Sequence, residues 1–188
     1  MATIRPVGKY DIIDIEYICR VTAGNGCRRE PVKGSVIAKM YSTYYARECR
    51  DTSFVLADDR NRPVGYVLCE SDHNRFRKIF RKKDVPAIWK LNKELGLEAS
   101  VFHVPYDVFG RKYPAHLHID ILPEYQNKGY GAEMIKTLLT KLKEMNIPGV
   151  MLITNRDNKG AIRFYERLGF KTLLAIGGPV IMAKNLTE

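Results

Sequence analysis

The first group of residues that could bind a ligand consists of a glutamine and two glycines. The pattern is Gln126-x-x-Gly129-x-Gly131, between an apolar run and an amphipathic segment. Glycine permits a sharp turn and a close approach of the backbone to a ligand. The first N–H groups of a following helix have no partner within it and favour an anion. The pattern predicts a phosphate-binding turn, although by itself it also fits an ordinary tight turn before a helix.

Two further groups of residues suit proton transfer. His116, His118 and Asp120 alternate along an expected strand and therefore share one face. A histidine titrates near neutral pH and suits a general base, and Asp120 can orient it or act directly. The phenol of Tyr165, on an expected amphipathic helix, is normally protonated at neutral pH. Both His118 and Tyr165 also fit a purely structural role, in the sheet and in the core.

Other phosphate-binding patterns are missing. No Gly-Lys-Ser/Thr follows a four-residue gap after a glycine, so the turn is not a Walker loop. No third glycine follows Gly131 at the spacing of the dinucleotide fingerprint. These absences disfavour a nucleotide-binding protein of another class.

The elements that position these residues follow from periodicity and from proline, glycine and cap signals. Strands are expected at residues 3–7, 53–58, 63–71, 116–122, 150–154, 170–176 and 179–184. Helices are expected at 11–21, from a Ser35 cap to about 49, from Gly131 to about 145, and from an Asp157 or Asn158 cap to Gly169. This order predicts a mixed α/β sheet with helices on both faces.

Two blocks of sequence resemble the GNAT family of N-acetyltransferases. They are IDILPEYQNKGYGAEMI at 119–135 and NKGAIRFYERLGF at 158–170. The stretches IRPVGKYDIIDIEYICRVTAGNG and YPAHLHIDILPEYQ look like a narrower subgroup, similar to the acetyltransferase-like domain of some O-GlcNAcases. The resemblance implies a GNAT-type, mostly antiparallel sheet of about seven strands. It covers most of the chain and is weakest between residues 72 and 112.

The resemblance also implies a cosubstrate and roles for individual residues. Acetyl-CoA is expected, with no metal. Its pyrophosphate is expected on the turn, its pantetheine arm beside the backbone of Ile119 and Ile121, and Asn158 is expected to hydrogen-bond that arm. The turn residues are Gln126, Asn127, Lys128, Gly129, Tyr130, Gly131 and Ala132. The catalytic residues are expected to be Tyr165 as the acid, with His118 and Asp120 on the basic side.

The function expected from the resemblance is transfer of acetyl from acetyl-CoA to a primary amine, by direct attack in a ternary complex. The alternative is a binding module that holds CoA or a partner without turnover. A small amine, an aminoglycoside, a polyamine and a protein N-terminus remain open as acceptors. Nucleic acid and membrane are not expected as partners, and the chain is expected to be a monomer or a homodimer.

Residues 72–114 depart from the minimal family pattern and form an expected helical insertion between the third and fourth strands. His73–Lys83 contains six basic residues and no acidic one. A second helix is expected at Pro86–Leu95, and Val101–Tyr113 is expected to be irregular. The insertion is interpreted either as a cap that attracts acidic groups to the acceptor side or as a buttress with a solvated basic face. Three tyrosines of the second expected helix either contact substrate or pack on the sheet: Tyr41, Tyr44 and Tyr45.

Composition bounds the remaining expectations. The 188 residues, 45% of them hydrophobic, predict a single domain, 1–188. The net charge of +10 favours anionic partners such as CoA or an acidic acceptor, or describes no more than a basic surface. Four cysteines without metal spacing predict reduced thiols and a cytoplasmic protein. The longest near-apolar run, Leu173–Ala183, is too short to span a bilayer.

Overall fold

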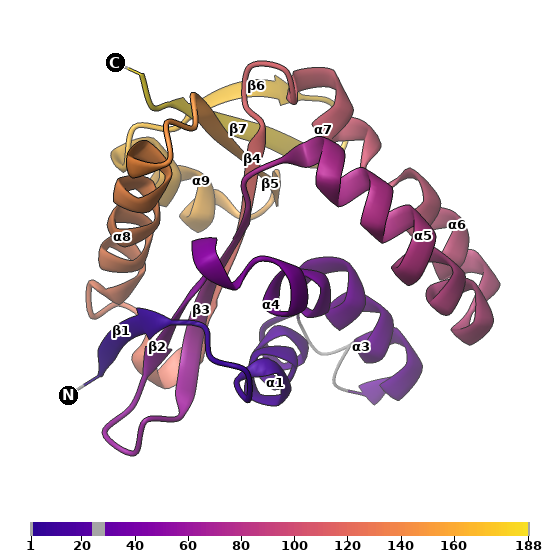
Figure 1. Ribbon diagram of the computed structural model, residues 1–188, viewed down its shortest axis with the longest axis horizontal. Coiled ribbons are helices and arrows are strands. Elements are labelled where there is room, and N and C mark those ends of the chain that lie inside the picture. Colours follow the sequence, from indigo (N-terminus) through magenta and orange to yellow (C-terminus); the bar gives the residue numbers. More distant parts are fainter. Residues whose placement is uncertain (1, 24–28, 188) are drawn as a thin grey trace.

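The computed structural model describes residues 2–23 and 29–187, and the strands in these ranges form a seven-stranded sheet (Figure 1). The strand order is β1-β2-β3-β4-β5-β7-β6, and only β4 and β5 are parallel neighbours. The predicted mixed, mostly antiparallel sheet is confirmed. Its strands are β1 Thr3–Pro6, β2 Phe54–Ala57, β3 Pro63–Glu70, β4 Ala115–Ile121, β5 Gly149–Asn155, β6 Lys171–Ala175 and β7 Pro179–Asn185.

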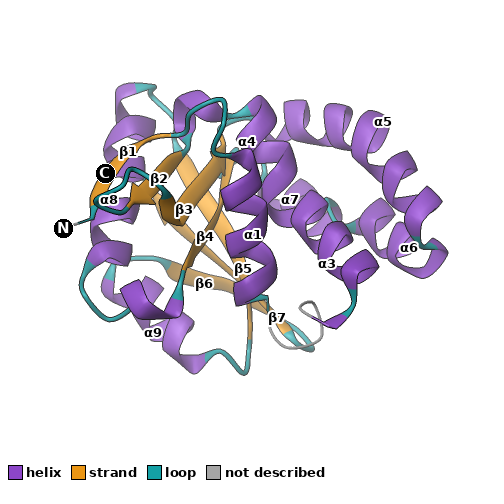
Figure 2. Cartoon of the chain, turned by 90° about the horizontal axis from the view of Figure 1, so that it is seen from below, coloured by secondary structure: helices purple, strands orange, loops and turns teal. Residues whose placement is uncertain are grey.

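Helices cover both faces of the sheet (Figures 1 and 2). One face packs against α8 (Tyr130–Glu144) and α9 (Lys159–Arg167), and the other against α1 (Ile12–Thr22), α3 (Pro31–Ala38) and α4 (Tyr44–Glu48). Residues of the strands alternate between the two cores, as the pleat of a sheet requires. The stripe predicted for α8 is confirmed, with Met134, Ile135, Leu138 and Leu142 buried.

The sheet opens between its two parallel strands. β4 pairs with β5 only through Ala115 with Val150 and His116 with Met151. Beyond His116, the edge of β4 that faces β5 has no strand partner within the described ranges. The backbone at Ile119 therefore remains available to a ligand along that edge, whereas the carbonyl of Ile121 accepts a hydrogen bond from the Gln126 side chain.

The insertion is helical, and one of its predicted boundaries is wrong. α5 (His73–Leu91) runs straight through Pro86, where a new helix was expected, and α6 (Lys93–Val101) follows it and packs alongside (Figure 1). Proline normally ends a helix because it removes a hydrogen bond and clashes with the preceding turn. Here a buried stripe at four-residue spacing holds the helix through the proline: Phe76, Phe80, Asp84 and Ile88.

Two other boundaries also differ from expectation. The segment expected to be irregular contains α7 (Val104–Phe109), whose Pro105 lies in the first turn, where a missing N–H costs little. The helix expected to start at Ser35 begins at Pro31, and the Ser35 hydroxyl donates to the Pro31 carbonyl at 2.9 Å. A π-helical turn, Lys39–Thr43, joins α3 to α4.

Three of the cysteines are buried, as predicted, and no disulfide joins them: Cys19, Cys49 and Cys69. Cys27 and the predicted Gly24-Asn25-Gly26 loop lie outside the described residues. Across the ranges that the structure covers, no helix is both long and apolar enough to cross a bilayer.

Candidate functional site

The glycine turn leads directly from β4 into α8. Asn127 and Gly129 adopt left-handed backbone angles, with φ of 58° and 87°. Gly129 also precedes the first residue of α8 and offers no side chain to cap it. The free N–H groups at the start of α8 therefore face outward without a side-chain acceptor, which is the arrangement that favours an anion.

Gln126 stabilises this turn from within. Its side-chain amide donates a hydrogen bond of 2.7 Å to the carbonyl of Ile121, at the end of β4. One side-chain donor of Gln126, a residue predicted to bind the cofactor, is thus already used inside the protein. The backbone N–H of Gln126 is also used within the turn, since it donates to the Pro123 carbonyl at 3.2 Å.

Gly131 sets the distance between α8 and α9. A Cβ added at Gly131 would lie 3.3 Å from the Phe164 ring, whereas one at Gly129 would meet nothing within 4 Å. Glycine is therefore required at the two positions for different reasons: Gly129 permits the left-handed turn, and Gly131 permits close helix packing.

A cavity of about 800 Å³ lies between β4, the glycine turn and the start of α9. It brings together ten of the residues predicted for the site: Ile119, Asp120, Ile121, Gln126, Asn127, Gly129, Gly131, Ala132, Asn158 and Tyr165. Three other predicted residues, His118, Lys128 and Tyr130, are not among those that line it. The residues that line the cavity without having been predicted for the site are Tyr125, Gly160, Ala161, Arg163, Phe164, Arg167 and Leu168.

Asn158 caps α9, as expected, and its side chain keeps a donor for a ligand. Its side-chain oxygen accepts a hydrogen bond of 3.0 Å from the Ala161 N–H and so caps α9. This cap accounts for the start of α9. The amide NH₂ group of the same side chain is a donor, and Asn158 lines the cavity.

Asp120 lies on the cavity wall in a polar but confined setting. Its carboxylate accepts a short hydrogen bond from the Tyr66 hydroxyl. Burial raises the pKa of Asp120 to about 6, and the hydrogen bonds from Tyr66 and Thr22 oppose that rise. A carboxylate with a pKa near 6 is ionised at neutral pH and basic enough to accept a proton.

Tyr165 lies on α9 and is only 8% exposed. Burial raises the pKa of its phenol above the ordinary value, and the negative charge of Asp120 raises it further. The phenol is therefore protonated at neutral pH, and its state is coupled to that of Asp120. One cavity thus holds a proton acceptor and a hydrogen-bond donor.

His118 has different surroundings, although it shares a strand face with Asp120. The Tyr45 hydroxyl lies 3.0 Å from His118 Nε2 and 2.9 Å from His116 Nδ1. The Tyr41 ring meets the His118 ring edge to face at 5.2 Å between centroids. Burial lowers the pKa of His118 to about 3, so the imidazole is neutral and weakly basic. The structure does not bring His118 to the cavity with Asp120 and Tyr165.

The tyrosines of the second helix divide between the two expected roles. Tyr44 and Tyr45 are fully buried and pack with Phe76, so they belong to the core. Tyr41 is partly exposed and contacts Phe102 and His118. Of the three, Tyr41 alone has access to solvent near β4.

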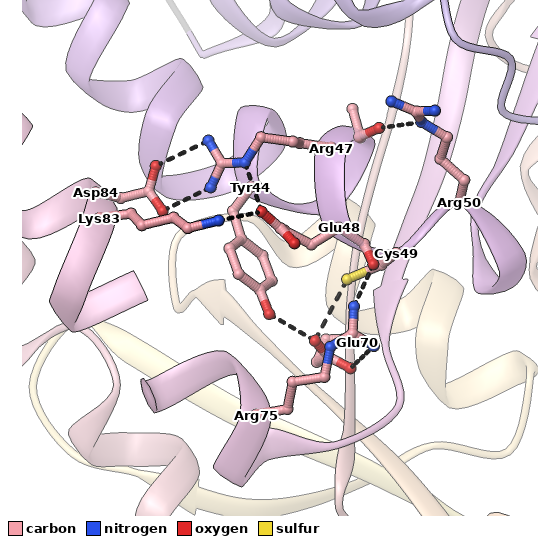
Figure 3. Close-up of polar contacts among 10 residues, drawn as sticks. Tyr44, Arg47, Glu48, Cys49, Arg50, Glu70, Arg75, Lys83 and Asp84 are labelled. Carbon is pink, nitrogen blue, oxygen red and sulfur yellow. Dashed lines mark hydrogen bonds and ion pairs between the residues drawn. The ribbon is translucent and has the colours of Figure 1, made fainter. Parts of the chain in front are cut away.

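Ionic contacts and hydrogen bonds, several of them to buried carboxylates, fix the insertion to the rest of the fold (Figure 3). Glu70, at the end of β3, accepts a hydrogen bond of 2.6 Å from the Tyr44 hydroxyl and lies 3.6 Å from Arg75 Nη1. Asp84 pairs with Arg47 at 3.0 Å, and Lys83 pairs with Glu48 at 3.2 Å. Part of the basic run therefore anchors α5 to α4 and β3.

The other basic side chains of the run remain on the surface. Arg77 pairs with Asp107 at 3.4 Å, whereas Lys78, Arg81 and Lys82 are exposed. These four residues and Asn74 line a shallow depression on α5. Within the ranges that the structure covers, no group of three or more His, Cys, Asp or Glu side chains is arranged to hold a metal ion.

The profile of the Acetyltransferase (GNAT) family matches residues 28–170. The chain therefore belongs to the GNAT family of acetyltransferases, and the predicted class, an acyltransferase of a family that uses acetyl-CoA, is confirmed. A crystal structure described as SsHAT is 30% identical, with a TM-score of 0.87, and the alignment covers 100% of this chain and 99% of that chain.

Two protein relatives bear names within the same class. The chain is 25% identical over 184 residues to an uncharacterized N-acetyltransferase of Methanocaldococcus jannaschii, covering 98% of this chain and 67% of that protein. It is 26% identical over 133 residues to N-alpha-acetyltransferase 30 of Schizosaccharomyces pombe, covering 71% of this chain and 66% of that protein. The alignments thus span about two thirds of the length of these relatives.

Proposed function

We propose that this protein transfers the acetyl group of acetyl-CoA to a primary amine, by direct attack in a ternary complex. The observation behind the proposal is one cavity that combines a glycine turn at a helix start, a carboxylate and a buried phenol. Each of these groups matches one requirement of acyl transfer: binding of an anionic carrier, removal of a proton, and stabilisation of a leaving group.

The residues of the cavity fit acetyl-CoA. The uncapped start of α8 offers N–H groups to the pyrophosphate, and the unpaired edge of β4 offers backbone groups to the amide-containing pantetheine arm. Asn158 adds a side-chain donor. When bound, acetyl-CoA supplies the acetyl thioester, and the chain supplies orientation and proton handling.

Asp120 is the proposed general base, instead of the expected His118. It lines the cavity, its pKa of about 6 leaves it ionised at neutral pH, and its carboxylate can take the proton from the attacking amine. His118 is held by Tyr45 and has a pKa near 3, so it accepts a proton poorly. Its proposed role is to support the strand next to the base.

Tyr165 is the proposed donor to the leaving sulfur. A phenol is a weaker acid than a thiol, so its main contribution is a hydrogen bond to the developing thiolate, not early proton transfer. Its pKa also depends on the charge of Asp120. When Asp120 takes the proton from the amine, that charge disappears and Tyr165 becomes a better acid at the moment when the sulfur leaves.

The acceptor that suits this base is an α-amine. A free α-amine has a pKa of about 7.7–8.0, against about 10.4 for a lysine side chain, so it is already partly neutral at physiological pH. A carboxylate with a pKa of about 6 can then remove the remaining proton during attack. The name of the Schizosaccharomyces relative, N-alpha-acetyltransferase 30, supports the same class of acceptor.

Other expectations remain proposals. The finer resemblance, to the acetyltransferase-like domain of O-GlcNAcases, rests on the two sequence stretches quoted above. The single domain 1–188, a cytoplasmic location and a monomer or homodimer also stay predictions.

The experiment measures thiol release from acetyl-CoA with a panel of amines: a peptide with a free N-terminus, the same peptide with a blocked N-terminus and a free lysine, and small polyamines. The highest kcat/KM is expected with the free N-terminus. Turnover with small amines only would overturn the proposed acceptor class. No turnover with any amine, together with CoA binding in calorimetry, would favour the binding module.

A further inference from the structure

Two arginines line the cavity in addition to the groups already assigned. Arg163 and Arg167 lie four residues apart on α9, so they occupy neighbouring positions on one side of the helix. They flank Phe164, the ring that Gly131 of α8 would touch if it carried a Cβ. Both arginines are exposed and line the cavity next to the ring that packs against the start of α8.

Neither arginine is neutralised by the protein. In residues 2–23 and 29–187, neither side chain has an ion-pair or hydrogen-bond partner, whereas Arg5, Arg47, Arg62, Arg75 and Arg77 all pair with carboxylates. Two like charges one helical turn apart repel each other. An anion between them would remove that repulsion.

The charge of the cavity is uneven. Among the described residues that line it, Asp120 on the β4 wall is the only acidic one, and Arg163 and Arg167 on α9 are the only basic ones. CoA has one phosphate group in addition to the pyrophosphate, at the 3′ position of its ribose. If the pyrophosphate takes the N–H groups of α8, this second anion remains for the arginines, and a guanidinium matches phosphate geometry well.

We propose that Arg163 and Arg167 form a binding site for the 3′-phosphate of CoA, so that the enzyme selects free CoA thioesters. The inference rests on the proposed binding of acetyl-CoA. It excludes efficient use of carriers that present only a phosphopantetheine arm, because these lack the 3′-phosphate. Recognition of the donor is thus divided: backbone groups hold the pyrophosphate, and side chains of α9 identify the ribose phosphate.

The experiment compares CoA with 3′-dephospho-CoA by isothermal titration calorimetry at low ionic strength. The wild type is expected to bind dephospho-CoA at least about tenfold more weakly, the effect of losing charge-assisted hydrogen bonds at a partly exposed site. In the Arg163→Ala/Arg167→Ala variant, CoA binding should fall by a similar factor and the two ligands should differ by less than about twofold. The matched control is Lys136→Ala/Lys143→Ala, which removes the same charge from exposed positions of α8 outside the cavity lining and should keep the wild-type preference.

Each other outcome has a distinct meaning. Equal affinity of the wild type for both ligands would overturn the 3′-phosphate site while leaving acetyl-CoA binding intact. An equal loss of both ligands in the arginine variant would also overturn it, because the arginines would then serve the pyrophosphate. No binding of CoA to the wild type would overturn the proposed function itself.

Discussion

The two faces of the sheet use their polar groups in opposite ways. On the face covered by α8 and α9, polar groups keep hydrogen-bonding capacity: the first N–H groups of α8, the amide of Asn158 and the side chain of Arg163. On the other face, polar groups mainly bind one another. Glu70 is held by Tyr44, and Tyr45 bridges two histidines of β4.

This difference separates the residues that can bind a ligand from those that fix the fold. A buried polar group that already has its partners stabilises one arrangement and has little left for a substrate. The buried His103 illustrates this, since its Nδ1 lies 2.7 Å from Asp107 Oδ2. Asp107 also lies 2.5 Å from Nε2 of the buried His73, and the two contacts tie α5 to α7. Titratable groups are therefore abundant beside β4, but few of them reach the cavity.

The largest effect on turnover is expected from replacing the one carboxylate found among the described residues of the cavity lining. Asp120→Asn keeps the size of the side chain and removes the base, so kcat should fall by roughly 10²–10⁴-fold. The wild-type kcat/KM should rise with pH through about 6 as Asp120 loses its proton, and this rise should be missing in the variant. A pH profile at saturating acetyl-CoA measures both effects. Unchanged kcat would remove Asp120 from the mechanism.

A somewhat smaller effect is expected at the donor. Tyr165→Phe keeps the buried ring and removes only the hydroxyl, so CoA binding should survive and kcat should fall by about 10²–10³-fold. The loss should lie in kcat and not in KM, because the hydrogen bond strengthens as charge develops on sulfur. Steady-state kinetics measure kcat and KM, and calorimetry measures the affinity for CoA. A purely packing role would leave kcat nearly intact, since Tyr→Phe changes little buried volume.

Much of the candidate site around the glycine turn could be predicted from the sequence, because its structure depends on residues that are close in the chain. The left-handed turn at Gly129, the apolar stripe of α8 and the cap at Asn158 each depend on residues within a few positions. Glycine, periodicity and a capping side chain are signals that a single sequence contains. Arg163 and Arg167 were missed because their place at the cavity depends on how α9 packs against α8.

The other face could not be predicted in the same way because its causes are distant in sequence. Burial that no local pattern shows lowers the pKa of His118, and Tyr45, which contacts the ring, lies 73 positions earlier in the chain. Pro86 remains inside α5 because tertiary burial of Phe80 and Ile88 outweighs the local helix-breaking signal. The role of His118 as a base stays a prediction, and it was made from the strand pattern alone, which shows none of the neighbours that bury the ring.

The third prediction concerns the stability cost of the raised pKa of Asp120. In the folded protein this pKa is about 6, above the usual value near 3.9, so between pH 4 and 6 the folded state binds more protons than the unfolded state. Stability therefore falls as pH rises through that window, and the cost is fully present at pH 7. Asp120→Asn should be more stable than the wild type by about 1–3 kcal/mol at pH 7, and no more stable at pH 4.

Urea denaturation at the two pH values measures this difference, with Asp157→Asn as a control at an exposed carboxylate. The control should match the wild type at both pH values. Equal stability of Asp120→Asn and the wild type at pH 7 would mean that Asp120 is not confined as the structure indicates. A stabilised but inactive variant is the usual sign of a group kept for function.

The smallest effect on turnover is expected at His118, and it sharpens the comparison along a single strand. His118→Gln keeps a polar group within reach of Tyr45 and removes the imidazole. Turnover should fall by less than about tenfold, below the range of a general base, and the rise of kcat/KM near pH 6 should remain. The pH dependence of the effect on stability should run in the opposite direction to that of Asp120→Asn, with the gain at low pH. Because burial lowers the pKa of His118 to about 3, the unfolded chain binds a proton below pH 6.5 that the folded chain does not. The wild type therefore loses stability as pH falls from 6.5 towards 3, and the variant should lose less.

Kinetics and urea denaturation across this range test the expected effects of His118→Gln on turnover and on stability. If turnover instead fell by about a hundredfold or more and the pH dependence disappeared, His118 would be the base and Asp120 its partner.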